Sequence, residues 1–116
     1  TFKIALFTDI SGYSTSSTAY STSNEVSSSG TNYSAGGNAL DSQAVSVASN
    51  TALVDFADEV FSSVTLSAVG AVIYNSTNSD KIVVVLDFGG TKTATNGDFT
   101  IQFPAAGAST AIIRIA

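Results

Sequence analysis

The sequence predicts an all-β domain, built as an antiparallel β-sandwich or partly closed barrel of about seven strands. Apolar residues recur with a period of two along most of the 116 residues, and no segment carries a convincing helical stripe. Turn-forming residues separate these segments at short intervals, as is typical of all-β domains. The exception is residues 9–42, which show almost no strand pattern. The length predicts one domain, residues 1–116, with its own core.

The first three predicted strands rest on alternation of side chains between two faces. Segment 2–8 (FKIALFT) carries apolar residues on both faces, with one lysine. Segment 43–49 (QAVSVAS) groups Val45 and Val47 on one face and a serine on the other, and 51–56 (TALVDF) follows after a short turn. These segments therefore fit strands that contribute one or both faces to a core.

The next two predicted strands form a hairpin. Segment 63–74 (SVTLSAVGAVIY) begins with alternation and becomes apolar on both faces from Ala68 onward, as expected of a strand near the middle of a sandwich. Segment 81–88 (KIVVVLDF) is β-branched and apolar on both faces, so we expect a central strand. The turn cluster NSTNSD at 75–80 joins them.

The last two predicted strands lie near the end of the chain. Segment 98–103 (DFTIQF) alternates cleanly, and Asn96-Gly97 before it is a strong tight-turn signal because both residues tolerate positive φ. Pro104 ends this strand, since proline cannot donate to a ladder. Segment 110–115 (TAIIRI) closes the chain as the seventh strand.

Residues 14–37 (STSSTAYSTSNEVSSSGTNYSAGG) are dominated by Ser, Thr and Gly and carry a single charge, Glu25. So long a stretch without strand pattern inside a compact domain is usually functional or disordered, although one short strand around Asn24–Val26 would fit. We interpret residues 9–42 as an arm or long loop that becomes ordered on a partner. Deletion of 14–37 is then expected to leave the β core folded but to abolish assembly.

Four residues of this stretch are the candidate partner-binding residues: Tyr13, Tyr20, Val26 and Tyr33. Tyrosine among serine, glycine and asparagine is the composition of adaptable contact surfaces. The alternative is that the tyrosines pin the loop back onto its own sheet. Composition alone leaves both interpretations open.

Composition also limits the classes of function. Charged residues make up 11% of the chain and the net charge is −5, so the basic stripe that nucleic-acid binding needs cannot be assembled. The longest apolar run, residues 82–86, is far too short to span a membrane. Neither nucleic acid nor a membrane is an expected partner. The start of the chain lacks a secretory pattern, and the absence of methionine indicates loss of an initiator or a few leading residues.

The side chains that usually carry catalysis are scarce. Histidine and cysteine are absent, and no motif supplies a base for a serine nucleophile, so we expect no enzyme activity, no cofactor and no metal. The glycine pairs 36–37 and 89–90 lack a phosphate-loop context and are interpreted as turns. Asp55, Asp58 and Glu59 (DFADE) would fit a glycosidase pair or a calcium site, but we interpret them as an acidic turn between two strands.

Several stretches together resemble a family of small tailed-bacteriophage virion structural proteins. They are FKIALFT (2–8), NEVSSSGTNYSAGGNAL (24–40), DFADEVFSSVT (55–65), AVIY (71–74) and DFGGTKTATNGDFTIQFPAAG (87–107). The family shows a strand of the type K-x-A-L-F-T, an N-E-V-S-G-T-G-Y-x-A-G-G-x-x-L block and a DFG…NGDFTIQW ending, in the same order. This chain departs from it at Phe103, where tryptophan is usual, in a longer serine run at 27–29, and in its ending AIIRIA.

The resemblance implies a non-enzymatic virion structural protein. At least some members look like capsid decoration (cement) proteins, which bind the lattice of the major capsid protein and stabilise it. The implied location is the virion capsid, with assembly in the host cytoplasm, and self-association as a dimer or trimer is expected. The alternatives are a tail or baseplate adaptor that binds another virion protein, and a receptor-facing carbohydrate-binding module.

Overall fold

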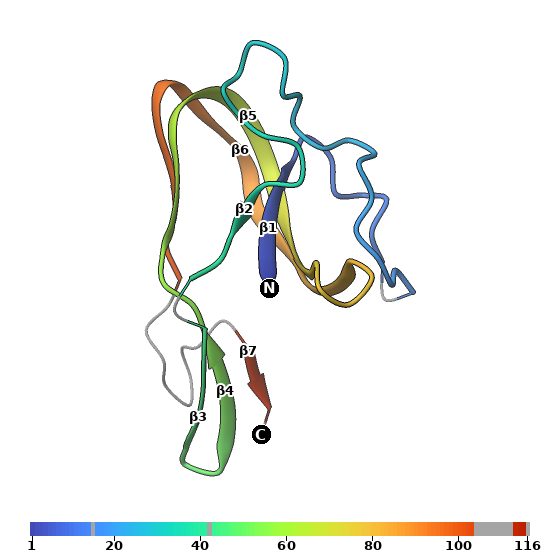
Figure 1. Cartoon of the computed structure of the whole chain (residues 1–116), viewed down its shortest axis with the longest axis vertical. Helices are drawn as coiled ribbons and strands as arrows, with labels where there is room; N and C mark the ends of the chain where they lie inside the picture. The colour runs from blue at the N-terminus through green and yellow to red at the C-terminus, as the bar shows by residue number, and fades with distance from the viewer. Residues whose placement is uncertain (15, 42, 104–112, 116) are drawn as a thin grey trace. The chain divides into compact units, whose positions relative to one another are not determined.

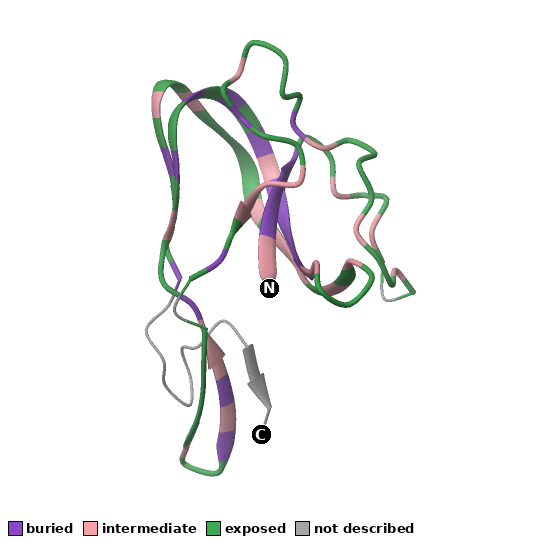
Figure 2. Ribbon diagram, in the orientation of Figure 1, coloured by how far each residue is buried: buried purple, intermediate pink, exposed green. Residues whose placement is uncertain are grey.

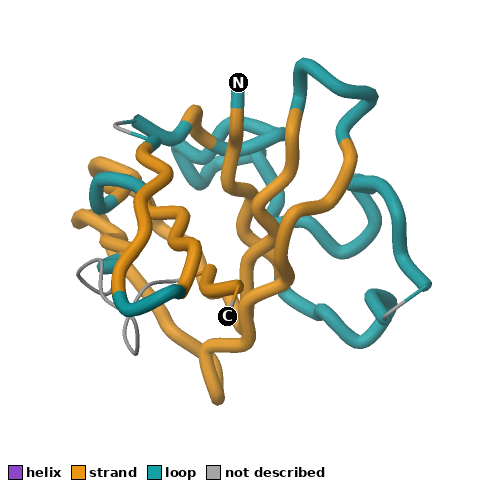
Figure 3. The backbone as a smooth tube through the Cα atoms, turned by 90° about the horizontal axis from the view of Figure 1, so that it is seen from below, coloured by secondary structure: helices purple, strands orange, loops and turns teal. Residues whose placement is uncertain are grey.

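A computed structural model describes residues 1–14, 16–41, 43–103 and 113–115, the last as backbone. These residues are all-β: Figure 3 shows strands and loops without a helix. The strands are β1 (Phe2–Phe7), β2 (Asn38–Ala39), β3 (Ala44–Ala48), β4 (Thr51–Asp55), β5 (Glu59–Asn75), β6 (Lys81–Ile101) and β7 (Ile113–Ile115), labelled in Figure 1. In the described part of the chain, no helix is present that could cross a membrane.

The chain divides into two compact units, described separately below. The first comprises residues 1–39 and 61–99, and the second comprises 40–60 and 100–116. Each contains one antiparallel sheet, and the described residues form no closed barrel. The predicted all-β, antiparallel fold is therefore confirmed, as one four-stranded and one three-stranded sheet among the described residues.

The sheet of the first unit has the strand order β2-β1-β5-β6. β1 pairs along its whole length with β5, from Phe2 opposite Asn75 to Phe7 opposite Gly70. Its other side pairs with β2, a two-residue strand that the sequence pattern did not reveal. β5 and β6 are neighbours joined by the turn at 76–80, which confirms the predicted hairpin.

The core of this unit lies along β1 and β5. The four residues Ile4 to Phe7 are fully buried, so both faces of β1 are covered. β5 alternates between buried and exposed residues in its first half, and every residue from Gly70 to Tyr74 is buried. The change to apolar residues on both faces, predicted from Ala68 onward, thus marks where β5 runs through the core (Figure 2).

β6 departs from the prediction in two ways. It is the outer strand of its sheet rather than a central one, and Val83 is exposed. It also continues unbroken from Lys81 to Ile101, so the predicted strands 81–88 and 98–103 are parts of one strand. An apolar, β-branched segment reports good strand propensity, but it does not determine where in the sheet the strand lies.

The sequence predicted turns at Asn96-Gly97 and at Gly89-Gly90, and this prediction is wrong. Both pairs lie inside β6, where the chain does not reverse. Asn96 and Gly89 do adopt positive φ, at 49° and 77°. Ser63 of β5 also has a positive φ, at 53°, and its backbone N–H donates a hydrogen bond to Oδ1 of Asp98 in β6 at 3.2 Å. Positive φ within a strand is typical of a bulge, which bends a strand without reversing it.

The sheet of the second unit has the order β3-β4-β7. β3 and β4 pair from Ala44 opposite Asp55 to Ala48 opposite Thr51, and β7 pairs with the other side of β4. The connection between β3 and β4 is the two-residue turn Ser49-Asn50, with φ of 49° and 62°. Two positive φ values define the type I′ turn that favours a tight hairpin.

The ends of this sheet agree with the predicted boundaries where they are described. Segments 43–49 and 51–56 correspond to β3 and β4 within one or two residues, and β7 covers the last part of 110–115. Pro104 and the start of segment 110–115 lie outside the described residues.

Candidate functional site

The Ser/Thr/Gly-rich stretch lies against its own sheet in the first unit. Its middle runs beside the end of β1, where Glu25 forms an isolated bridge with Phe7. Val26 N–H donates to the carbonyl of Leu6, and Thr8 N–H donates to the carbonyl of Asn24, both at 2.9 Å. The short strand expected around Asn24–Val26 is thus present as a single bridge.

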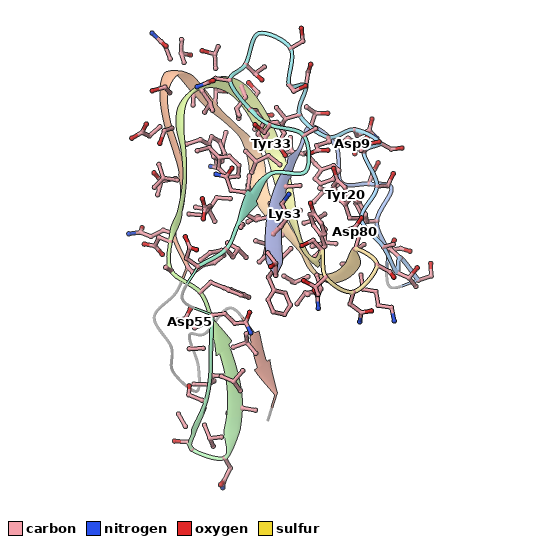
Figure 4. The ribbon with its side chains drawn as sticks, viewed as in Figure 1. Lys3, Asp9, Tyr20, Tyr33, Asp55 and Asp80 are labelled. Carbon is pink, nitrogen blue, oxygen red and sulfur yellow. The ribbon has the colours of Figure 1, made fainter. Side chains whose placement is uncertain are left out.

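A second anchor fixes the stretch to the outer strand of the sheet. Ala19 forms an isolated bridge with Lys81, at the start of β6. Tyr20 N–H donates to the carbonyl of Asp80 at 2.9 Å, and Ile82 N–H donates to the carbonyl of Thr18 at 3.1 Å. Tyr20 and Asp80 therefore lie side by side, as labelled in Figure 4.

Aromatic rings fill the space between the loop and the sheet. The ring of Tyr13 meets Phe7 edge-on at a centroid distance of 5.4 Å. Tyr20 stacks on Tyr74 of β5, with centroids 4.3 Å apart and an interplanar angle of 10°. Ile10 joins this cluster and lies over Gly70, where an added Cβ would come within 2.8 Å of the Ile10 side chain. The apolar side chains of the loop thus complete the core on one face of β1.

Glu25 is the centre of a hydrogen-bonded group that we call the Glu25 cluster: Tyr20, Glu25, Tyr33, Gly36 and Tyr74. One carboxylate oxygen accepts a hydrogen bond from the Tyr20 hydroxyl. The other accepts from the Tyr33 hydroxyl at 2.6 Å and from Gly36 N–H at 2.7 Å. Tyr74 donates to the carbonyl of Gly36 at 2.6 Å. The only charged side chain of residues 14–37 therefore accepts hydrogen bonds from three donors of the same stretch.

The cluster is tied to the sheet through Tyr33. Its hydroxyl accepts a hydrogen bond from Leu6 N–H of β1 at 3.0 Å while it donates to Glu25. Its ring lies 5.7 Å from that of Phe61 in β5, centroid to centroid. Tyr33 thus connects the carboxylate of Glu25 with backbone and side chains of two strands.

Burial and the nearby carboxylate make these phenols hard to ionise. Burial, followed by the hydrogen bond to Glu25, raises the pKa of Tyr20 and of Tyr33 far above the ordinary value of 10.0. Burial, followed by the charges of Asp80 and Glu25, raises the pKa of Tyr74 to about 12. At neutral pH all three phenols keep their protons and can donate hydrogen bonds.

The glycine pair 36–37 forms a turn, as predicted, and leads the stretch into β2. Gly37 N–H donates to the carbonyl of Ser34 at 3.0 Å, and Gly37 has φ of 75°. A Cβ added to Gly37 would lie 1.8 Å from the carbonyl oxygen of Ile4. Glycine is required here because the chain passes directly against the backbone of β1.

The four candidate partner-binding residues all contact their own sheet. Val26 is 5% exposed and Tyr33 is 3% exposed, whereas Tyr13 and Tyr20 are half-buried. The structure therefore shows a long loop packed on its own strands and not an extended arm. Since Val26 and Tyr33 belong to the core, deletion of 14–37 is no longer expected to leave that core intact. A contact of these residues with a partner stays a prediction.

Sequence reasoning did not identify Glu25 as the centre of this site. The available signal was its isolation, as the single charge within a long neutral stretch flanked by Tyr20 and Tyr33. A lone carboxylate among hydroxyls and backbone N–H groups is an acceptor without a cationic partner, so it attracts neutral donors.

The acidic segment DFADE lies in the second unit and connects β4 with β5. Asp58 Oδ1 accepts a hydrogen bond from Phe103 N–H at 2.8 Å, a structural contact that agrees with the turn interpretation. Asp55 Oδ1 is buried and has no hydrogen-bond partner within the described part of the chain. No group of three potential metal-ligating side chains is found among the described residues.

Residues between Asp9 and Asn24 line an open hollow of about 510 Å³. Its lining combines hydroxyl groups with a carboxylate, an amide and two phenols, including Asp9, Tyr13, Tyr20 and Asn24. Such a surface offers hydrogen-bond donors and acceptors with little charge.

Comparison with known proteins gives no match to a protein-family model, a curated protein or a solved structure. The support for a function is therefore the sequence resemblance to virion structural proteins together with the geometry of the loop.

Proposed function

We propose that this protein decorates and stabilises the capsid of a tailed bacteriophage by binding the lattice of the major capsid protein. The proposed contact surface is the outer side of residues 9–37. The observation that carries the proposal is that this loop is fixed to its own sheet at several points while most of its hydroxyl-bearing residues remain exposed.

A preformed loop favours binding because little conformational entropy remains to be lost. Ordering a flexible segment on a partner would subtract from the affinity of every contact it makes. Here the Glu25 cluster and the aromatic rings already order the loop. A protein that binds many equivalent positions on a lattice gains from this at every position.

We assign the four candidate residues to two roles. Tyr13 and Tyr20 are half-buried and line the hollow, so they are the members that would touch the capsid protein. Val26 and Tyr33 are buried and would act by holding the loop in place. In this proposal the protein is a structural part of the virion, joins the capsid in the host cytoplasm and performs no chemical reaction.

The proposal is tested by the stoichiometry of the chain in purified particles, measured by mass spectrometry against the major capsid protein. Near-equal abundance supports a lattice-covering decoration protein. A few copies per particle would instead favour a tail or baseplate adaptor bound to another virion protein. Absence from particles would overturn the proposal.

A matched pair of variants tests the surface. Thr22 is exposed on the loop and Thr91 is exposed on β6. We expect Thr22→Arg to lower occupancy on particles by about tenfold or more, because a bulky charge enters the contact. Thr91→Arg adds the same charge outside it and should bind as the parent does. Equal binding of both variants would place the contact elsewhere.

The hollow favours one second candidate, a receptor-facing carbohydrate-binding module. Sugars are bound by combined hydroxyl, amide and carboxylate groups with an aromatic face nearby, and the lining of the hollow offers these groups. The test is titration of the protein with surface oligosaccharides of the host, followed by NMR. Saturable shifts at Tyr13 and Asn24 would support this candidate. Their absence, together with full occupancy on the capsid, would exclude it.

A further inference from the structure

β3 is the outer strand of the second sheet among the described residues, and it is exposed along most of its length (Figure 2). Of the large apolar side chains that the structure describes, Val45 and Val47 are the most exposed, at 71% and 75%. Outer strands are normally protected by lysine, proline or a bulge, because their free backbone groups otherwise pair with another strand. None of these protections is present in β3, and residues 43–54 contain no charged side chain in a chain of net charge −5.

The turn determines which backbone groups face outward. In a two-residue hairpin the residues on either side of the turn form a hydrogen-bonded pair, here Ala48 and Thr51. Bonded and non-bonded pairs then alternate, so Ala44, Ser46 and Ala48 use their N–H and C=O groups toward β4. The corresponding groups of Val45 and Val47 point to the open edge.

The sequence of β3, Ala-Val-Ser-Val-Ala, reads the same in both directions. We propose that β3 pairs antiparallel with β3 of a second copy of this chain, about a twofold axis at Ser46. Val45 then faces Val47 of the second copy, and the two serines face each other. A twofold interface presents the same patch on both subunits, as any strand paired antiparallel with its own copy does. The palindrome adds that each residue of β3 faces a residue of its own kind, alanine opposite alanine and valine opposite valine.

The hydrogen-bonding phase agrees with this register. The outward-facing groups belong to Val45 and Val47, and these residues meet each other across the axis as two hydrogen-bonded pairs. A shift by one residue would place an outward group opposite an inward one. A shift by two residues would keep the phase but leave one valine opposite Gln43 or Ser49.

The product is a continuous six-stranded sheet, in the order β7-β4-β3 of one copy followed by β3-β4-β7 of the other. The row of side chains Val54 and Val45 continues into Val47 and Ala52 of the second copy, so the exposed valines gain apolar neighbours. Pairing of five residues buries less than a standard interface of about 1,600 Å² in total, so the free dimer is weak. High local concentration, as on a shared surface, strengthens it.

A single cysteine tests the register, because the chain contains no cysteine of its own. Across the proposed axis the two Ser46 residues form a non-hydrogen-bonded pair, with Cα atoms about 4.5 Å apart, within reach of a disulfide. We expect Ser46→Cys to cross-link under mild oxidation at least about tenfold faster than two controls. Ser28→Cys is a control at an exposed position of the loop. Val45→Cys is a control within β3, because residue 45 faces residue 47 of the second copy and not residue 45. Equal rates for the three variants would overturn the proposal.

Sedimentation velocity provides a second test on the chain without cysteine. Val47→Lys places a charge on the open edge, and Val83→Lys makes the same change at an exposed valine of β6. We expect only the first to weaken self-association, by about tenfold or more. A parent protein that stays monomeric at millimolar concentration, or equal effects of both lysines, would contradict the proposal. The dimer proposal is separate from the proposed function. A protein that stays monomeric but still occupies the capsid would refute the dimer and leave the capsid proposal standing.

Discussion

Replacement of Glu25 tests whether its carboxylate holds the loop on the sheet. Glu25→Gln keeps the length of the side chain but leaves one acceptor oxygen in place of two. With the amide oxygen toward Tyr33 and Gly36, the hydrogen bond from Tyr20 is lost and the other two become neutral. Glu25→Ala removes all three and leaves the buried hydroxyl of Tyr33 without its acceptor.

The size of the effect follows from these contacts. A hydrogen bond to a charged group contributes about 1.5–3 kcal/mol, and a neutral one about 1 kcal/mol. Glu25 is half-buried, so solvent screening lowers each bond to the carboxylate slightly below that range, to roughly 1.2 kcal/mol. We expect a loss of about 2 kcal/mol in the free energy of unfolding for Glu25→Gln and about 3–4 kcal/mol for Glu25→Ala. Either is a large share of a total stability of about 5–15 kcal/mol.

The assay is urea unfolding followed by circular dichroism and by tyrosine fluorescence, which is usable because the chain has no tryptophan. With a slope of about 2 kcal/mol per molar urea, Glu25→Gln should lower the midpoint by about 1 M. In a chain of this length the melting temperature should fall by roughly 6–10 °C. The slope should stay unchanged if the loop remains part of one cooperative core.

The matched control is Asp41→Asn, which removes a carboxylate at an exposed position. It should change stability by less than about 0.5 kcal/mol. Tyr33→Phe combined with Glu25→Gln should be less destabilising than the sum of the single changes, by about 1 kcal/mol, because the two residues share a hydrogen bond. A Glu25→Ala variant as stable as the control would refute the idea that the carboxylate anchors the loop.

Three further predictions concern the same loop. Gly37→Ala should destabilise by at least about 3 kcal/mol in urea unfolding, because the new Cβ meets the carbonyl of Ile4 at positive φ, while Gly12→Ala meets nothing within 4 Å and should be neutral. A phenol whose pKa is raised in the folded state stabilises the fold below pH 10, and this contribution is lost as pH rises. For Tyr74 we expect the free energy of unfolding to fall between pH 10 and about 12. Tyr74→Phe should remove this part of the decrease from the stability–pH curve. Deletion of 14–37 should abolish cooperative unfolding, and a deleted chain that still unfolds cooperatively would show that the loop is dispensable.

The strands were largely predictable because their signals are local. Short apolar segments bounded by turn residues located β1, β3 and β4, and the switch to apolar residues on both faces located the buried half of β5. The same local signals failed at Asn96-Gly97, since positive φ occurs both in a tight hairpin and in a bulge. Only the pairing of β6 with β5 decides between them, and that pairing is not encoded in a short window.

The residue types of the site were predictable from the sequence, but the surface that they contact was not. The tyrosines of the loop indicated a contact surface, yet the same residues serve a contact with a partner or with their own sheet. Which surface the tyrosines contact depends on the path of the chain after each turn. At Gly37, for example, the turn brings the stretch against the backbone of β1. The role of Glu25 depends on that path as well, because its donors come from positions before and after it in the sequence.

Residues 14–37 bind their single charge, Glu25, through their own donors and leave neutral hydroxyls outside, so Asp9 is the one exposed carboxylate within residues 9–37. Contacts made by the outer side of the loop should therefore depend little on salt, because few charges are available to be screened. We expect occupancy on capsids to change by less than about twofold between roughly 0.05 and 0.5 M salt, measured by pelleting particles with the labelled protein. A steep loss at high salt would instead assign the binding to the acidic residues outside 14–37, and would contradict the neutral loop as the contact surface.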